Sequence, residues 1–401
     1  MPTRPHLVMI ETNGNQRFIF DAPRLRDAVG ASALLTRLES WTRAAEPALP
    51  KCEDPEHAAP ELRDARAPNW VSAVSGKVIF TVKTEQDARR VISEVTRRAL
   101  TDAPGMDICG VFTELQGQEV AQNDLDRIHS LAAQYGLDRS PVQARFPQLP
   151  FLERAKDSAL PASPRLGIAG EAKDDQGDQL SLPARVKRHS AYSRRRELLT
   201  RAMEESALLK HQEDRLVRDP TKLEEALRRA FLDSNTGTNT DPQGNPDTEP
   251  ESDEFSEDQE ILARIEQLPT LSKVAVIHID GNGVGAVMRN LKQAMDRVPE
   301  TILRQARVVD ERANESNLRL FLLSVTNRLA KAAVGAFAHA WARVSELASL
   351  AGPVPVVPVI LGGDDVTVIT SGDYALPFAA EYLREYEKRT GHDPVLKYLG
   401  A

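Results

Sequence analysis

The chain has 401 residues, a formal net charge of −8 at pH 7 and a pI near 5.6. A chain of this length exceeds one typical hydrophobic core and predicts two or three domains. The acidic balance argues against a dedicated nucleic-acid coat protein, because such proteins carry a basic excess that neutralises phosphates.

Cysteine content and hydropathy bear on the compartment. Cys52 and Cys109 are too few for a disulfide scaffold or a zinc cluster, which favours a reducing cytoplasm. No uninterrupted run of 18 or more apolar residues occurs, and no signal-type apolar segment follows residues 1–6. We therefore expect a cytoplasmic protein that has no membrane partner.

The first 120 residues alternate strand and helix patterns. A strand is predicted at 7–10, a helix at 25–41, a hairpin at 70–75 and 78–83, a helix at 85–100 and a strand at 106–115. This β-α-β-β-α-β order is that of a ferredoxin-like domain. Its hairpin turn is Ser75-Gly76-Lys77-Val78, which has no acid to hold a divalent metal. We interpret Lys77 as a solvated turn residue in preference to a phosphate ligand, and Glu11 at the end of the first strand as a solvated or structural carboxylate.

The middle of the chain changes character. Residues 141–184 are rich in proline and charge, and 185–232 have a basic helical pattern that includes Arg185, Lys187, Arg188, Arg194, Arg195, Arg196 and Arg201. Such a run is more often a solvated helix face than a surface that steers polyanions. Residues 234–260 are dominated by polar and acidic residues that cannot bury enough apolar surface, so we predict a flexible acidic linker.

An acid follows the next predicted strand. Residues 271–279 are apolar and lead into Asp280-Gly281-Asn282-Gly283-Val284-Gly285, after which a helix is expected. The glycine spacing does not fit a dinucleotide fingerprint. Val284 and Leu291 stand where a calcium loop of the EF-hand type needs acidic or amide side chains. The remaining interpretation is a strand-end Asp280 that shares metals with a downstream site, beside a turn with room for a triphosphate.

Three further features of this region have a structural interpretation. A long helix is predicted at 316–351, with Ser316 as its N-cap and Gly352-Pro353 as its end. His278 alternates with its isoleucine neighbours, so it faces the opposite side of the sheet and is interpreted as structural. After a second helix at 374–390, His392-Asp393 is an isolated pair and does not indicate an HD-type nuclease.

Two adjacent acids near the end of the chain are the strongest functional signal. Strands predicted at 356–361 and 366–370 leave only Gly362-Gly363-Asp364-Asp365 to form a hairpin turn. Adjacent carboxylates repel one another unless a cation or solvent accompanies them, and oxygen ligands at a glycine-rich turn suit Mg²⁺ or Mn²⁺. The alternative is an ordinary solvated turn, because Gly-Asp turns are common.

Asp280 at a strand end, a long helix and then this hairpin resemble the palm domain of the Cas10/Cmr2 family, which is similar to the palm of GGDEF diguanylate cyclases. Residues 7–14, 18–20 and 25–32 also look like the opening of proteins that carry such a palm. The likeness covers both ends of the chain and only loosely its middle, where 151–162 lacks the paired cysteines of the family.

The resemblance implies a set of site residues. Two Mg²⁺ or Mn²⁺ ions would be held by Asp280, the Gly281 carbonyl, Asp364 and Asp365, and the three aspartates would be catalytic. The nucleotide would lie against Gly281, Asn282, Gly283, Gly362, Gly363, Ser324 and Lys397, although a core or surface role is the simpler interpretation of Ser324, Asn327 and Arg328.

The expected fold class is α+β, with two ferredoxin-like palms joined by a helical, partly disordered connector. The predicted boundaries are 1–120 for a degenerate first palm, 121–233 for the connector, 234–266 for the linker and 267–401 for a second palm that stops before its last strand.

The resemblance implies a two-metal nucleotidyltransferase that condenses NTPs, ATP foremost, into a cyclic nucleotide or oligonucleotide messenger in antiviral defence. An RNA or a partner protein would activate it, in a homo-oligomer or a multisubunit complex. The alternative is a nucleotide sensor without turnover, or a scaffold subunit of a type III CRISPR-like effector complex.

Overall fold

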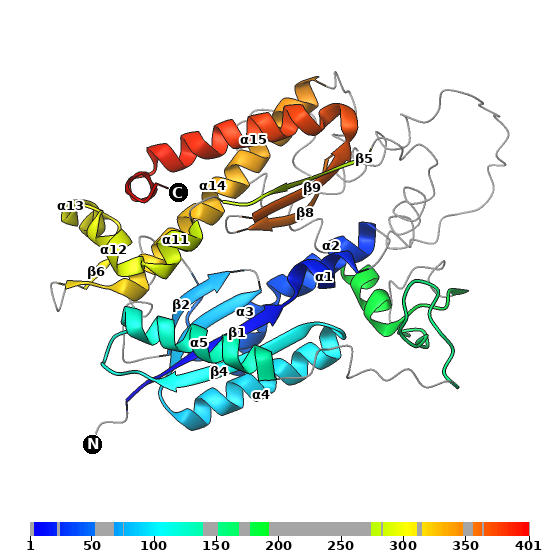
Figure 1. Ribbon diagram of the computed structural model, residues 1–401, viewed down its shortest axis with the longest axis horizontal. Coiled ribbons are helices and arrows are strands. Elements are labelled where there is room, and N and C mark those ends of the chain that lie inside the picture. The colour runs from blue at the N-terminus through cyan, green and yellow to red at the C-terminus, as the bar shows by residue number, and fades with distance from the viewer. Residues whose placement is uncertain are drawn as a thin grey trace, which may run out of the picture.

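The computed structural model is an α+β protein in which the two larger antiparallel sheets are joined by helices (Figure 1). It describes residues 4–21, 25–52, 68–74, 76–138, 151–167, 177–191, 274–281, 284–310, 315–347, 356–362 and 365–400. The predicted acidic linker, the basic residues after 191 and the turn residues Ser75, Asn282, Gly283, Gly363 and Asp364 lie outside this part of the chain.

The first sheet confirms the ferredoxin-like prediction. Its strands are β1 (His6–Asn13), β2 (Asn69–Val74), β3 (Lys77–Val82) and β4 (Asp107–Glu114), and their spatial order is β2-β3-β1-β4 with every pair antiparallel. Helix α4 (Glu85–Asp102) connects β3 to β4 and is capped by Thr84 Oγ1, which accepts a hydrogen bond of 3.1 Å from Asp87 N.

The segment between β1 and β2 is more divided than the sequence predicts. The single helix expected at 25–41 is two helices, α2 (Leu25–Thr36) and α3 (Leu38–Ala45). They are separated at Arg37, whose amide hydrogen bonds to the Leu34 carbonyl in a tighter 3₁₀-type turn. A short helix that the sequence did not indicate, α1 (Asn15–Phe20), begins after Gly14, whose φ of 62° turns the chain out of β1.

The second sheet contains β5 (Val274–Ile279), β8 (Val356–Gly362) and β9 (Asp365–Ser371) in the order β5-β9-β8, all antiparallel. This is the order of the first three strands of a ferredoxin-like domain. In the described residues no strand pairs with the outer edge of β5. Small elements fill the space before the long helix: α11 (Val284–Arg289), α12 (Leu291–Asp296), α13 (Glu300–Gln305) and the two-residue strands β6 (Val309–Asp310) and β7 (Glu315–Ser316).

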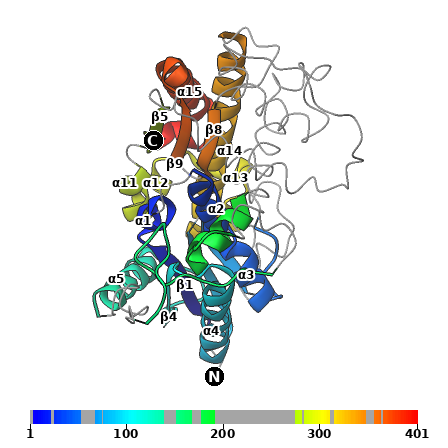
Figure 2. The same cartoon turned by 90° about the vertical axis from the view of Figure 1, so that its right-hand side faces the viewer.

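The long helix α14 (Leu318–Leu347) belongs to both halves of the molecule (Figures 1 and 2). Phe321 near its start lies in one buried cluster with Met9 and Ile79 of the first sheet, whereas Phe337 further along packs with Val368 of the second. The second palm therefore packs, through α14, against the face of the first sheet that contains Met9 and Ile79.

The start of α14 corrects one prediction. Asn317, not Ser316, caps the helix, because Asn317 Oδ1 accepts a hydrogen bond of 3.1 Å from Leu320 N while Ser316 ends β7. By length and composition, Leu318–Val344 would suffice to cross a membrane, but 72% of its most apolar window is buried inside the protein. It therefore behaves as a core helix.

Helix α15 (Gly372–His392) runs along α14 and covers the second sheet (Figure 1). Its aromatic residues Phe378, Tyr382 and Tyr386 stack on one another at centroid distances of 6.4 and 5.9 Å. A short 3₁₀ turn, η4 (Leu396–Tyr398), then leads back to the buried cluster around Phe321.

The first basic residues of the connector are buried, which corrects the interpretation of this segment as a solvated helix face. Arg185, Lys187 and Arg188 are each 5% exposed or less and belong to a helical segment, 182–191, that packs on α2. Arg188 Nε donates to Asp27 Oδ1 at 2.9 Å, and Lys187 Nζ donates to the Phe18 carbonyl at 2.6 Å. Lys187 and Arg188 therefore anchor the connector to the first palm, whereas Arg185 bonds within the connector, to the carbonyls of Ser163 and Asp178. All three are buried and are not available to a polyanion.

Candidate functional site

Two acids face one another where β5 and β9 meet the hairpin turn. Ile279 pairs with Val366, so the same antiparallel register places Asp280 opposite Asp365, and Gly362 pairs with Asp365 across the turn. Asp280 is exposed and Asp365 is half-buried. Like charges at opposite positions of neighbouring strands repel, so this end of the sheet favours a bound cation.

The first sheet has the same register with different side chains. Ile10 pairs with Val78, and the next pair is Glu11 with Lys77, which form an ion pair of 2.9 Å between Glu11 Oε2 and Lys77 Nζ. An ammonium group thus stands beside the strand-end acid of the first palm, where the second palm has a second carboxylate. Glu11 is therefore a paired carboxylate, as a structural role predicts, and Lys77 is bound to it.

The two hairpins also differ in their turns. Gly76 of the first turn has a φ of 79°, and its carbonyl accepts a hydrogen bond of 3.0 Å from Thr12 Oγ1. By register, Gly76 corresponds to Asp364 of the second turn, which lies outside the described residues. The first hairpin is thus held to its own sheet by its backbone and by the Glu11–Lys77 pair.

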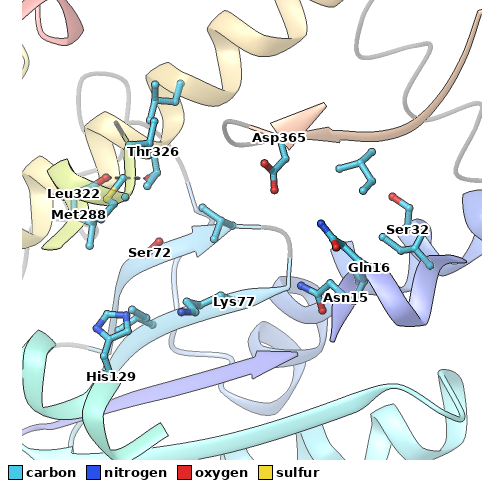
Figure 3. A pocket seen from close by; sticks show the side chains of 18 of the residues that line it. Asn15, Gln16, Ser32, Ser72, Lys77, His129, Met288, Leu322, Thr326 and Asp365 are labelled. Atoms are coloured by element: carbon cyan, nitrogen blue, oxygen red, sulfur yellow. Dashed lines mark hydrogen bonds between the residues drawn. The ribbon is translucent and has the colours of Figure 1, made fainter. Parts of the chain in front are cut away.

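A cavity of about 390 Å³ lies between the two palms, and Asp365 lines it (Figure 3). In Figure 3, Asp365 extends from β9 toward a floor formed by the first sheet, with Lys77 below it and Asn15 and Gln16 of α1 to one side. Much of the remaining wall is apolar, from Ile19, Leu35, Val74, Ile79, Leu125, Val284, Met288, Leu322, Leu329 and Ile360. A cavity with an apolar wall and a few polar groups at one end is typical of a small-molecule site.

Sequence reasoning missed the contribution of the first palm to this cavity. Asn15, Gln16, Ser72 and His129 all line it, although none belongs to a motif that suggests binding. His129 lies on helix α5 (Gln122–Asp138), within the predicted connector, which packs against β1 and β4 of the first palm. No signal in the sequence predicts which face of the second palm these residues meet.

His278 faces the side of the sheet opposite to Ile277 and Ile279, as the alternation predicts. That side borders the cavity, and His278 lines it. Its Nδ1 lies 2.8 Å from Thr367 Oγ1, its cross-strand partner in β9. The sequence did carry a signal for this, because residues 278 and 280 are two apart and share a face.

Two of the residues that the resemblance places beside a nucleotide, Ser324 and Lys397, do not line this cavity. Ser324 is fully buried in α14, where its Oγ accepts a hydrogen bond of 3.0 Å from Arg328 Nε. Lys397 is exposed, with its ammonium 5.1 Å from the ring centroid of Tyr398. Neither lines the cavity, whereas Thr326, two residues after Ser324, does.

The pair His392-Asp393 is structural, in agreement with the absence of a nuclease motif. Asp393 Oδ2 accepts a hydrogen bond of 2.9 Å from Arg328 Nη1, and its Oδ1 accepts from the amides of Val395 and Leu396. The His392 ring nitrogen Nδ1 lies 2.6 Å from the Lys388 carbonyl. Both residues therefore hold the end of α15 in place.

The donor set at the turn fits a hard divalent cation. Asp280 and Asp365 carry carboxylate oxygens and Gly281, which follows Asp280 in the chain, carries a carbonyl oxygen, and these are the ligand types that Mg²⁺ and Mn²⁺ prefer. In the described part of the chain no three His, Cys, Asp or Glu side chains cluster as a metal site. A complete site would therefore draw on Asp364, on phosphate oxygens and on water.

No family model and no curated protein matches the chain. Among solved structures it is similar to Csm1 in a Csm1-Csm4 cassette with cA3, at a TM-score of 0.46, 11% identity and coverage of 100% of this chain and 52% of the other. A cassette with one ATP gives a TM-score of 0.43 and 12% identity, covering 97% and 49%.

A third cassette, with pppApApA, gives 0.46 and 12%, covering 99% and 51%. The chain thus spans about half the length of these solved chains. At such TM-scores the likeness adds no weight to an argument about function, which rests on the residues described above.

Proposed function

We propose that this protein is a metal-dependent nucleotidyltransferase that condenses NTPs, with ATP as the expected substrate, into a cyclic nucleotide or oligonucleotide. The observation that carries the proposal is the strand register, which continues from Ile279 with Val366 to place Asp280 opposite Asp365, a residue that lines the cavity, whereas the equivalent pair of the first palm is Glu11 with Lys77. Two carboxylates opposite one another, where the first palm has a carboxylate and an ammonium group, favour a bound cation at the second palm.

The residues of the chain have separable tasks in this reaction. Asp280, Asp364, Asp365 and the Gly281 carbonyl would hold two Mg²⁺ or Mn²⁺ ions, which when bound polarise an α-phosphate and acidify a ribose hydroxyl. The glycine turns at 281–283 and 362–363 let the backbone approach the phosphates closely. The apolar cavity wall suits a base and excludes water.

The bond changes balance without any further reagent. The ribose hydroxyl oxygen forms a bond to the α-phosphorus, the bond between that phosphorus and the pyrophosphate oxygen breaks, and the hydroxyl proton passes to solvent. The first palm contributes no metal ligand to this scheme, since Lys77 is paired with Glu11. It contributes cavity wall.

The test is to incubate the purified protein with each NTP and Mg²⁺ or Mn²⁺, with and without RNA, and to identify products by mass spectrometry. Removing both turn acids in Asp364→Ala/Asp365→Ala is expected to lower product formation at least about a thousandfold, as for loss of electrostatic stabilisation at a reacting phosphate. Asp296→Asn is the matched control, because Asp296 is an exposed acid whose carboxylate bonds to Lys292.

Product from the double variant at the wild-type rate would overturn the assignment. So would a wild-type protein that forms none with any NTP, metal or RNA activator.

A second function is favoured by one observation. The first palm shows that the fold keeps its sheet and hairpin when the acid pair is replaced by an ion pair, so a palm of this kind can serve without turnover. The chain would then be a nucleotide sensor or a scaffold subunit of a multisubunit complex in the cytoplasm. Nucleotide binding without any product, in the assay above, distinguishes this role.

A further inference from the structure

Two polar residues, His278 and Thr367, lie beside Asp280 and Asp365 on the second sheet. His278 and Thr367 are direct cross-strand partners, and they stand two residues from Asp280 and Asp365 on their respective strands. All four side chains therefore belong to the same face of the sheet, the one that borders the cavity. Residues two apart on a strand are separated by about 7 Å, which is comparable to the span of a triphosphate.

The imidazole ring of His278 is held in place by a hydrogen bond to its neighbour on β9. Its Nδ1 is 2.8 Å from Thr367 Oγ1, and Thr367 is fully buried, so the hydroxyl fixes the ring without competing for a ligand. Because Nδ1 is engaged, Nε2 is the ring nitrogen left to meet a bound molecule. In the tautomer in which the Thr367 hydroxyl donates to Nδ1, Nε2 carries the ring proton and is a preorganised hydrogen-bond donor on the cavity wall.

Cationic side chains are scarce among the described residues that line the cavity. Lys77 is the single lysine or arginine among the described residues that line it, and its ammonium is bound to Glu11 at 2.9 Å. His129 lies on the opposite wall, on α5. A polyphosphate anchored by a metal at Asp280 and Asp365 would therefore meet His278 as the nearest ring donor on the same sheet face.

We propose that His278 is a nucleotide-binding residue that contacts the polyphosphate of the substrate through Nε2, and that Thr367 is the positioning residue that orients its ring. This inference rests on the proposed function and deepens it, because it assigns the second sheet a polyphosphate contact besides the metal ligands. The apolar wall on the far side of the cavity is left for the base.

The experiment compares two ligands on the 401-residue chain in the presence of Mg²⁺. The dissociation constants of a non-hydrolysable ATP analogue and of AMP are measured by calorimetry for the wild type and for His278→Gln. His278→Gln is expected to weaken binding of the triphosphate analogue about tenfold, the usual effect of losing one charge-assisted hydrogen bond, and to leave AMP binding unchanged.

Thr367 supplies a matched pair of variants for the positioning role. Thr367→Val keeps the shape of the buried side chain but removes the hydroxyl, and is expected to reproduce a part of the loss for the triphosphate analogue. Thr367→Ser keeps the hydroxyl and is expected to retain wild-type binding. His392→Gln, away from the cavity on α15, is the histidine control and should change nothing.

The outcomes separate this inference from the proposed function. If His278→Gln weakens neither ligand, or weakens both equally as a structural defect would, the inference is wrong while the proposed function stands. If the wild type binds no triphosphate analogue with Mg²⁺, the proposed function fails and takes the inference with it.

Discussion

At the scale of single residues, the two palms differ in what stands opposite the strand-end acid. Both sheets use the register of an isoleucine with a valine, followed by the residue pair that decides the chemistry. Glu11 and Lys77 have opposite charges and form an ion pair, whereas Asp280 lies opposite Asp365, which has the same charge. The difference of one side chain, lysine against aspartate, separates a structural contact from a candidate metal site.

Replacing the lysine should therefore move the first palm toward the second. Lys77→Asp would place an acid opposite Glu11, and we expect a loss of about 1 kcal/mol in the free energy of unfolding because the ion pair is partly exposed and like charges repel. Lys77→Met, which removes only the attraction, is the control and should cost less. Thermal unfolding measures both.

Added Mg²⁺ provides a second readout of the same change. It should raise the melting temperature of Lys77→Asp more than that of the wild type, since a cation relieves the new repulsion. Equal stability of Lys77→Asp and Lys77→Met, with equal responses to Mg²⁺, would contradict this account.

Asp27 gives a prediction for pH. Burial raises the pKa of the Asp27 carboxyl, and the Arg188 guanidinium opposes this shift without outweighing it. The folded protein then holds the Asp27 proton more tightly than the unfolded chain. Its contribution to stability is present below the ordinary pKa of 3.8 and is lost as the pH rises through the raised value.

The measurement is the stability of the wild type relative to Asp27→Asn as a function of pH, by urea unfolding. We expect the wild type to lose stability relative to the variant as the pH rises from 3.8 through that window, opposite to a typical acid. A relative gain over the same range would show that the ion pair with Arg188 dominates burial.

At the scale of elements, the connector helix at 182–191 is fixed to α2 by a close approach as well as by charge. A Cβ atom on Gly30 would lie 1.7 Å from the backbone carbonyl oxygen of Lys187, so only glycine permits this crossing. The same helix α2 contributes Ser32 and Leu35 to the cavity wall. The docked connector therefore supports one wall of the candidate site.

Gly30→Ala tests this crossing. Because the obstacle is backbone, the two helices must separate, and we expect a loss of about 1–3 kcal/mol in the free energy of unfolding. Gly136→Ala in α5 is the matched control, since no atom lies within 4 Å of its added Cβ, and it should be neutral or stabilising by up to about 1 kcal/mol. A Gly30→Ala variant as stable as the control would show that this docking is weak.

At the scale of the whole molecule, α14 makes the two palms one unit. Its first half is buried against the first sheet and its second half against the second, and the buried Arg319 Nη1 donates to the Trp70 carbonyl of β2 at 3.0 Å. The cavity exists only where these two packed halves meet. Stability and the candidate site are therefore shared between the palms.

Calorimetry can check this sharing. Phe321→Ala removes a fully buried ring at the junction, and we expect a loss of about 3–5 kcal/mol with both palms still unfolding in one transition. Phe151→Ala, which changes a ring that is 79% exposed, is the control and should have little effect. Two separate transitions in the wild type would contradict the view of one cooperative unit.

Much of the fold follows from local patterns in the sequence. Alternating apolar residues, short turns and helix-length periodicity sufficed for the α+β class, the ferredoxin-like order of the first palm and the placement of β5, β8 and β9, because these signals act between neighbours in the chain. The sequence also indicated the acids of the second hairpin and their absence from the first. The break at Arg37 and the cap at Asn317 escaped it, since one hydrogen bond decides each.

Packing between distant segments determines which residues share the cavity. The pairing of Glu11 with Lys77, the burial of Arg185 and Ser324 and the place of His278 on the cavity wall depend on the packing of the first palm, α14 and the connector against one another. Sequence periodicity says which residues share a face, but not what that face will meet, because the contact is made by segments far apart in the chain.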